Sequence, residues 1–172
     1  ARQEQAELYP WIHNPSNVAV TADLTRLVLV PDISAGEILA KMPTVAKGHA
    51  EMSMCAGEFV QVYKSQREQW DSIITCFFLD TASDVLEYLR VIHGALKPGG
   101  VWINGGPLLW HWQNSGPKGG TETSDERYAA STEISYEQLK QLIAAVGFDI
   151  KEERWDQVGY TSNPKCMLRS VY

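Results

Sequence analysis

One stretch decides the fold class: Ile73-Ile74-Thr75-Cys76-Phe77-Phe78-Leu79, which is apolar almost throughout and does not alternate with polar residues. A run of this length without alternation is typical of a strand buried on both faces, as in a parallel sheet. Asp80 ends the run. It is the longest apolar run of the chain and is far too short to span a bilayer. We therefore expect the central strand of an α/β protein, and no membrane segment.

Helical and extended patterns alternate on both sides of this strand. Apolar residues recur on one helical face over residues 83–97, and Pro98-Gly99-Gly100 stops that helix before a strand at 101–104. The capping box at Ser135–Gln138 opens a helix that Gly147 ends. The other expected elements are strands at 26–30, 52–57 and 148–155, helices at 34–42 and 58–64, and loops at Tyr9–Pro15 and 115–131. This alternation predicts an α/β fold with a mostly parallel sheet.

Length and composition exclude several classes of protein. The 172 residues fit one domain, and 44% hydrophobic with 21% charged residues is an ordinary globular composition. A net charge of −6 without a basic run makes a nucleic-acid or anionic-membrane binder improbable. Three cysteines without a C-x-x-C pair favour a reducing compartment and argue against a disulfide framework or a structural zinc. We expect no metal, and a cytosolic location with the nucleus as a second one.

Several polar residues follow the expected strands at the edge where parallel sheets bind ligands. Asp80 follows the buried strand, Gly105-Gly106-Pro107 follows the next one, and Glu58 follows the strand expected to end at Gly57. His111 comes shortly after the glycines and is expected over the same edge. The order of the elements therefore places Asp80 and His111 at one pocket.

Each candidate also has a purely structural interpretation. Asp80 fits an N-cap as well as a ligand-binding residue, and His111 fits a packed residue between two tryptophans. Cys76 fits a small buried hydrophobe, and Glu58 fits a helix N-terminus. The chain carries no G-x-S-x-G, H-E-x-x-H, Walker or G-x-G-x-x-G motif. Periodicity and spacing alone thus predict an α/β domain with one candidate pocket and no named reaction.

Short segments of the chain carry more information than its periodicities. They are, in order, Leu8-Tyr9-Pro10-Trp11-Ile12-His13, Ala56-Gly57-Glu58-Phe59, Trp70-Asp71, Cys76-Phe77-Phe78-Leu79-Asp80-Thr81-Ala82, the stretch 96–104 (LKPGGVWIN) and Gly106-Pro107-Leu108-Leu109-Trp110-His111. Together they resemble the carnosine N-methyltransferase family over almost the whole chain. The LKPGG piece is common to many methyltransferases, whereas CFFLDTA and GPLLWH are specific.

The resemblance implies a Rossmann-like class I methyltransferase fold that uses S-adenosyl-L-methionine to methylate an imidazole nitrogen of carnosine or a related dipeptide. On the cofactor side it implies roles for Glu58, Phe59 and Cys76, with Glu a mild departure from the Asp that the family commonly shows. On the substrate side it implies roles for Asp80, His111, Tyr160 and Tyr172. Of these, Asp80 and His111 are the residues expected to act in the transfer itself.

The resemblance also implies that parts of the methyltransferase sheet lie outside this chain. The glycine-rich cofactor loop and the acidic ribose-binding residue belong to the first two strands, expected before Ala1, and the last strand is expected after Tyr172. We therefore expect residues 1–172 to be one methyltransferase domain that forms the C-terminal portion of a longer chain. By itself this portion is expected to be weakly active or inactive, and a homodimer of the whole protein stays open.

Three alternative functions stay open at this stage. The chain fits a methyltransferase for another small imidazole or amine substrate. It also fits a non-catalytic binding module derived from a methyltransferase, an alternative that the missing glycine loop favours. A nicotinamide-binding Rossmann protein is the weakest alternative, because the chain offers no pyrophosphate site.

Overall fold

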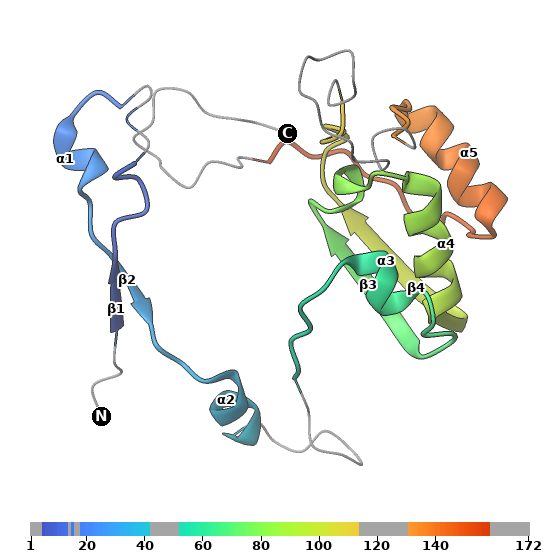
Figure 1. Ribbon diagram of the computed structural model, residues 1–172, viewed down its shortest axis with the longest axis horizontal. Helices are drawn as coiled ribbons and strands as arrows, with labels where there is room; N and C mark the ends of the chain where they lie inside the picture. Colours follow the sequence, from blue (N-terminus) through green and yellow to red (C-terminus); the bar gives the residue numbers. More distant parts are fainter. Residues whose placement is uncertain (1–4, 14, 16–17, 42–51, 114–130, 159–172) are drawn as a thin grey trace. The chain divides into compact units, whose positions relative to one another are not determined.

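The computed structural model describes residues 5–13, 15, 18–41, 52–113 and 131–158. Its contacts divide the chain into two compact units, one of Ala1–Ala56 with Asp156–Tyr172 and one of Gly57–Trp155 (Figure 1). Each unit is described by itself, and the organisation of 1–172 as one methyltransferase domain stays a prediction. No helix in the described ranges has the length and hydropathy needed to cross a membrane.

The first unit contains a small antiparallel sheet. Strand β1 (Gln5–Leu8) pairs with β2 (Val28–Pro31), and the unit also holds the short helix α1 (Thr21–Leu24) and the helix α2 (Ala35–Lys41). The structure confirms the strand expected at 26–30 and the helix expected at 34–42. The loop expected at Tyr9–Pro15 is confirmed over its described residues, 9–13 and 15, and the Ile12 amide closes a turn in it by donating to the Tyr9 carbonyl at 3.3 Å.

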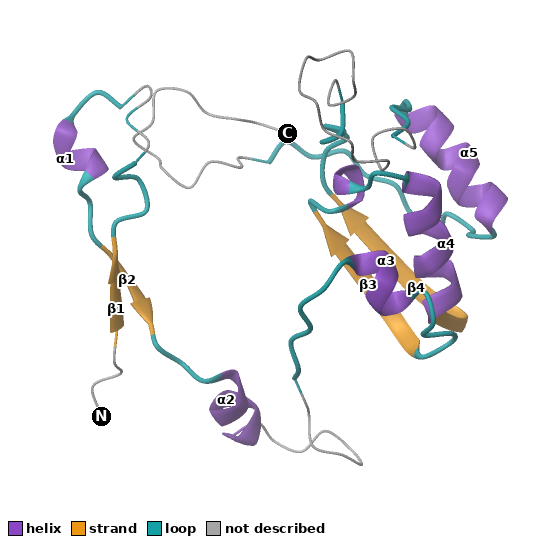
Figure 2. Cartoon of the chain, viewed as in Figure 1, coloured by secondary structure: helices purple, strands orange, loops and turns teal. Residues whose placement is uncertain are grey.

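The second unit has α/β architecture, with two parallel strands joined through a helix. Its elements are α3 (Phe59–Tyr63), β3 (Trp70–Cys76), the 3₁₀ turn η1 (Leu79–Thr81), α4 (Val85–Ala95), β4 (Leu96–Gly105) and α5 (Tyr136–Val146). Strands β3 and β4 pair in parallel, with Ile74 opposite Ile103 and Cys76 opposite Gly105 (Figure 2). The predicted α/β class with a parallel sheet is thereby confirmed for this strand pair.

The core of the second unit lies between the strand pair and the helices. Leu89 of α4 is fully buried, and Leu139 of α5 is 2% exposed. The buried cluster comprises Leu79, Ala82, Val85, Leu89 and Leu139. Trp102 of β4 packs against this cluster. One face of the strand pair is therefore covered by helices, and this covered face carries Ile73, Thr75, Trp102 and Asn104.

The opposite face of the strand pair corrects the expectation of burial on both faces. Ile74 is 70% exposed, and Val101 and Ile103 are each 55% exposed. The alternation of side chains along a strand directs these residues away from the helices. Within the described residues of the second unit no element covers this open face, which consists of Ser72, Ile74, Cys76, Val101 and Ile103. The apolar run is thus a strand with one buried face in this chain.

The bounds of several elements also differ from the prediction. Strand β3 begins at Trp70 and ends at Cys76, before the expected Leu79, because Phe77 has a φ of 50° and turns the chain out of the strand. Helix α4 begins at Val85, later than the expected 83, because the Asp84 carboxylate caps it by accepting the Leu86 and Glu87 amides at 2.9 and 3.1 Å. Strand β4 follows α4 directly at Leu96.

Two predicted strands are wrong. Residues 52–57 are irregular, and Met52 and Met54 are 62% and 91% exposed. Residues 148–155 are also irregular, and Phe148 packs its ring 5.1 Å from that of Trp102. Neither segment pairs with another strand among the described residues, and β propensity without a pairing partner does not make a strand.

Helix α5 begins as predicted. Ser135 and Gln138 form a reciprocal capping box, and Gly147 ends the helix with a φ of 117°. Burial, and after it the negative charge of Glu153, raises the pKa of Tyr136 in the first turn. The 115–131 loop prediction falls almost entirely on residues outside the described ranges.

Candidate functional site

The carboxyl end of β3 continues into a tight turn that holds the first candidate residue. The Phe77 amide donates to the Gly105 carbonyl at 2.7 Å, which extends the contact between β3 and β4 by one residue. The Thr81 hydroxyl donates to the Phe78 carbonyl at 2.6 Å and closes η1. Asp80 lies in the middle of this turn and is only 2% exposed. A carboxylate is therefore buried at the sheet edge where ligands bind in parallel folds.

Asp80 and His111 are joined through the backbone. The His111 amide donates to the Asp80 carbonyl at 3.0 Å, and Asp80 Oδ2 accepts the Leu109 amide at 3.0 Å. The predicted proximity of the two residues at one edge is confirmed. Asp80 does not cap α4, because Asp84 fills that position. The carboxylate instead holds the segment after β4 on the turn after β3.

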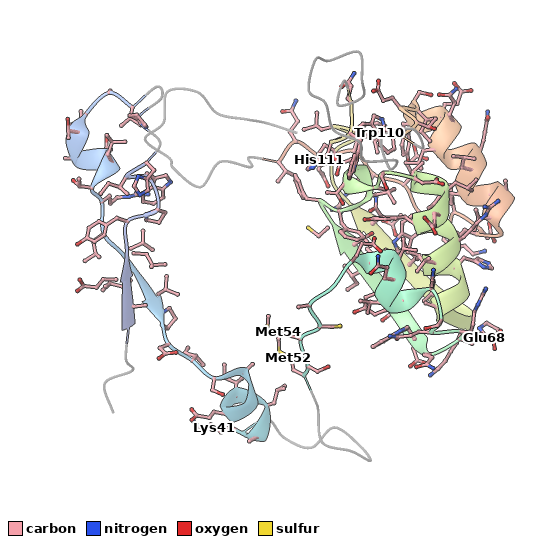
Figure 3. All side chains as sticks on the ribbon, viewed as in Figure 1. Lys41, Met52, Met54, Glu68, Trp110 and His111 are labelled. Carbon is pink, nitrogen blue, oxygen red and sulfur yellow. The ribbon has the colours of Figure 1, made fainter. Side chains whose placement is uncertain are left out.

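Two tryptophans flank His111, and their indole hydrogen bonds hold the segment that carries it. Trp112 Nε1 donates to the Thr81 carbonyl at 2.9 Å, and Trp110 Nε1 donates to the Ile134 carbonyl at 3.0 Å. Both indoles are half-buried, whereas His111 is exposed. Figure 3 shows Trp110 and His111 beside each other beyond the carboxyl ends of β3 and β4. His111 is thus an exposed ring on a rigidly held segment, which suits a binding residue.

The predicted cofactor residues Glu58 and Phe59 lie at the start of α3. Glu58 is the N-cap, and its two carboxylate oxygens accept the Val60 and Gln61 amides at 3.1 and 2.8 Å. The ring of Phe59 lies 5.1 Å from that of Phe78, beyond the end of β3. Phe59 therefore brings α3 to the same strand end as Cys76. Its other ring neighbours are Tyr63 and Tyr88.

Cys76 is the last residue of β3 and carries an exposed, free thiol on the open face. The interpretation as a small buried hydrophobe is wrong for this chain, because no described element covers that face. Tyr160 and Tyr172 lie outside the described residues. In the described ranges no group of three His, Cys, Asp or Glu side chains is placed to hold a metal ion.

One polar network at this edge was not recognised as a site from the sequence. Thr75 is buried and connects Trp102 to Asn104 across the strand pair. The only signal in the sequence is a polar residue near the end of each of two apolar strands, which is weak by itself.

We expect Glu58→Ala to lower the free energy of unfolding by about 0.5–2 kcal/mol, the usual cost of losing an N-cap. The reason is that two amides of the five-residue helix α3 lose their acceptors. Chemical denaturation of the full-length protein measures the effect. Glu58→Asp is the matched control, because a shorter carboxylate still caps the helix and should keep wild-type stability. Equal stability of the Ala and Asp variants would contradict the assignment of the cap.

Comparison with known proteins gives the following matches. The family model described as "Carnosine N-methyltransferase" matches residues 1–172. The mouse carnosine N-methyltransferase is 38% identical over 167 residues, which are 96% of this chain and 37% of the relative. The relatives of the same name from Dictyostelium discoideum and Schizosaccharomyces pombe are 39% and 31% identical, over 32% and 44% of their own lengths. The chain therefore spans less than half the length of these relatives.

Proposed function

The chain belongs to the carnosine N-methyltransferase family, and from this membership we propose that the full-length protein methylates an imidazole nitrogen of carnosine or a related histidine-containing dipeptide. S-adenosylmethionine is the proposed methyl donor, on a Rossmann-like sheet in which β3 and β4 are neighbouring strands. The structural observation that carries the proposal is that the His111 backbone amide donates to the Asp80 backbone carbonyl, which brings the two residues together at the carboxyl end of parallel strands. The proposed substrate is the one for which the relatives are named.

The proposed reaction needs a neutral ring nitrogen whose lone pair faces the methyl group. The Asp80 carboxylate keeps this nitrogen unprotonated by accepting a hydrogen bond from the N–H of the other ring nitrogen, which fixes the tautomer of the substrate. Its negative charge also stabilises the imidazolium product, so the interaction strengthens toward the transition state. An ionised carboxylate can accept several hydrogen bonds, so the bond from the Leu109 amide to Oδ2 leaves acceptor capacity for an N–H of the substrate.

His111 and its flanking tryptophans supply position. The His111 amide donates to the Asp80 carbonyl, so the backbones of the two residues are held beside each other. Orientation of the two reactants in line contributes several kcal/mol, about 7–11 at the extreme. We therefore assign His111 to binding the dipeptide beside Asp80, with Tyr160 and Tyr172 as further substrate-side residues.

The residues proposed for the cofactor side have chemistry that fits an adenosine sulfonium. S-adenosylmethionine, when bound, supplies an electrophilic methyl group on a positively charged sulfur. Phe59 and Phe78 place two aromatic rings 5.1 Å apart near the end of β3, where Cys76 also lies. Aromatic faces near a sulfonium contribute about 0.5–2 kcal/mol. The Glu58 carboxylate keeps acceptor capacity for the adenosine beyond its two capping bonds.

The first experiment is methyl transfer by the full-length protein. It is incubated with labelled S-adenosylmethionine and carnosine, and mass spectrometry detects one added methyl on the imidazole. Methylated carnosine is the expected result. Binding of S-adenosylhomocysteine without methylation of carnosine would keep a methyltransferase and replace the substrate with another imidazole or amine. Absence of both would favour a non-catalytic binding module.

The location of the protein is part of the proposal. The acidic charge without a basic run supports a cytosolic protein, with the nucleus as a second location. Fluorescence imaging of the tagged full-length protein tests this. Sedimentation of the same protein tests the homodimer.

A further inference from the structure

Two polar side chains are buried in the described part of the chain, and both lie at the carboxyl end of β3. They are Thr75, which is 5% exposed, and Asp80, which is 2% exposed. A polar group without a hydrogen bond is costly in such a position, so a buried polar side chain is retained where it is paired. Asp80 has a role in the proposed function, whereas Thr75 has none.

The donors and acceptors around the Thr75 hydroxyl set the direction of its hydrogen bonds. Trp102 Nε1 lies 2.9 Å from Thr75 Oγ1, and an indole nitrogen can only donate. The single hydroxyl proton of Thr75 has two acceptors within reach, Asn104 Oδ1 at 2.8 Å and the Ile103 carbonyl at 3.5 Å, and it is donated to the nearer one, Asn104 Oδ1. The carboxamide oxygen of Asn104 therefore faces Thr75. Within the described residues this bond engages Oδ1, so the two N–H groups on Nδ2 point to the other side of an exposed side chain.

The position of Asn104 in β4 suggests that the N–H groups on its Nδ2 donate to a ligand. Asn104 is the next-to-last residue of β4, at the strand end where ligands bind in parallel sheets. It lies on the covered face, the same side on which Leu79, the neighbour of Asp80, joins the core. Cys76 lies on the open face, opposite Gly105. Asn104 thus lies on the face of the strand pair opposite to that of the proposed cofactor residue Cys76, which favours the substrate side for its amide.

We propose that Asn104 is a substrate-binding residue whose carboxamide donates a hydrogen bond to an oxygen acceptor of the imidazole dipeptide, its carboxylate or its peptide carbonyl. Thr75 and Trp102 are positioning residues that orient this amide. The inference rests on the proposed function and deepens it, because it adds to the residues already assigned to the substrate a hydrogen-bond donor for the part of the dipeptide outside the imidazole. A donor of this kind selects dipeptides over free imidazoles.

The decisive variant is Asn104→Asp in the full-length protein. A carboxylate still accepts the Thr75 hydroxyl, so the network inside the sheet is kept, but the N–H donors are lost. We expect KM for carnosine to rise about 10–100-fold, as for a lost hydrogen bond to a charged group, with a smaller change in kcat. The dissociation constant of S-adenosylhomocysteine should not change. Asn104→Ala should raise KM by a similar factor.

Two conservative substitutions of Thr75 test its positioning role. Thr75→Ser keeps the hydroxyl and should keep wild-type KM. Thr75→Val keeps the shape but removes the hydroxyl, so the Asn104 amide loses its orientation and KM rises. A purely structural role would lower the melting temperature of Thr75→Val without moving KM.

The two candidate acceptors, the carboxylate and the peptide carbonyl, are distinguished with β-alanylhistamine, which is carnosine without its carboxylate. If the deficit of Asn104→Asp disappears with this substrate, the carboxylate is the partner of Asn104. If the deficit persists, the partner is the peptide carbonyl.

Two results would overturn the proposed role of Asn104. A KM within twofold of wild type for Asn104→Asp, with a lower melting temperature for Asn104→Ala, would show that the network only joins the strands. A weaker S-adenosylhomocysteine complex would move Asn104 to the cofactor side. Both overturn the proposal. If the wild-type protein does not methylate carnosine, the proposed function fails first. Calorimetric titration with carnosine and with β-alanylhistamine then tests the role of Asn104 by itself. Equal affinities of wild type and Asn104→Asp would overturn the proposal that Asn104 binds the substrate.

Discussion

Asp80→Ala is expected to lower methyl transfer by the full-length protein by about 10²–10⁴-fold, the range of a positioned acid–base group. The substitution removes the carboxylate that holds the substrate N–H and stabilises the imidazolium. It also removes the acceptor of the Leu109 amide, so the segment that carries His111 loses one of its attachments. The initial rate with saturating S-adenosylmethionine measures the effect. A variant within threefold of wild type would remove Asp80 from the mechanism.

The two roles of Asp80 are separated by Asp80→Asn. The carboxamide has nearly the same shape, and its oxygen can still accept the Leu109 amide, but it carries no charge. We expect this variant to keep the melting temperature of the wild type and to lose most of the activity. If the carboxylate acted only by holding Leu109, Asp80→Asn would keep near wild-type activity and Asp80→Ala alone would be impaired.

The α/β class was predictable because it depends on strong local signals. The apolar stretch that begins at Ile73, the apolar face of α4 and the capping box at Ser135 each act within a few residues, and each appears in the structure. The strands expected at 52–57 and 148–155 did not form, because a strand also needs a partner, which a local pattern does not reveal. The prediction that β3 is buried on both faces failed for the same reason, because burial depends on which other elements pack against the strand.

The site was predictable in its topology and not in its contacts. The rule that ligands lie at the carboxyl ends of parallel strands was enough to place Asp80 and His111 together. The sequence does not show that Phe77 leaves the strand with a positive φ, or that Thr75 and Asn104 pair across it. Such features depend on the register between strands that are distant in sequence, which is fixed only when the sheet has formed.

Gly106→Ala is expected to lower the free energy of unfolding of the full-length protein by about 2–6 kcal/mol. Gly106 has a φ of 146°, a conformation that costs other residues about 1–3 kcal/mol. An added Cβ would also lie 2.9 Å from Phe77 Cα and 3.0 Å from Phe77 N. These are backbone atoms, so they cannot rotate away, and relief of such overpacking costs about 1–3 kcal/mol more. Urea denaturation measures the loss.

Two other glycines separate the two causes of this loss. Gly99 has a φ of 79° but no atom within 4 Å of an added Cβ, so Gly99→Ala should cost only the conformational part. Gly105 also has no atom within 4 Å of an added Cβ and has no positive φ, so Gly105→Ala should be nearly neutral. Gly106→Ala should therefore be the least stable of the three variants. It should also reduce methyl transfer, because Gly106 begins the segment that carries His111, and its displacement from Phe77 moves that segment relative to Asp80. Equal stability of Gly106→Ala and Gly99→Ala would show that the close contact with Phe77 does not hold the strand ends together.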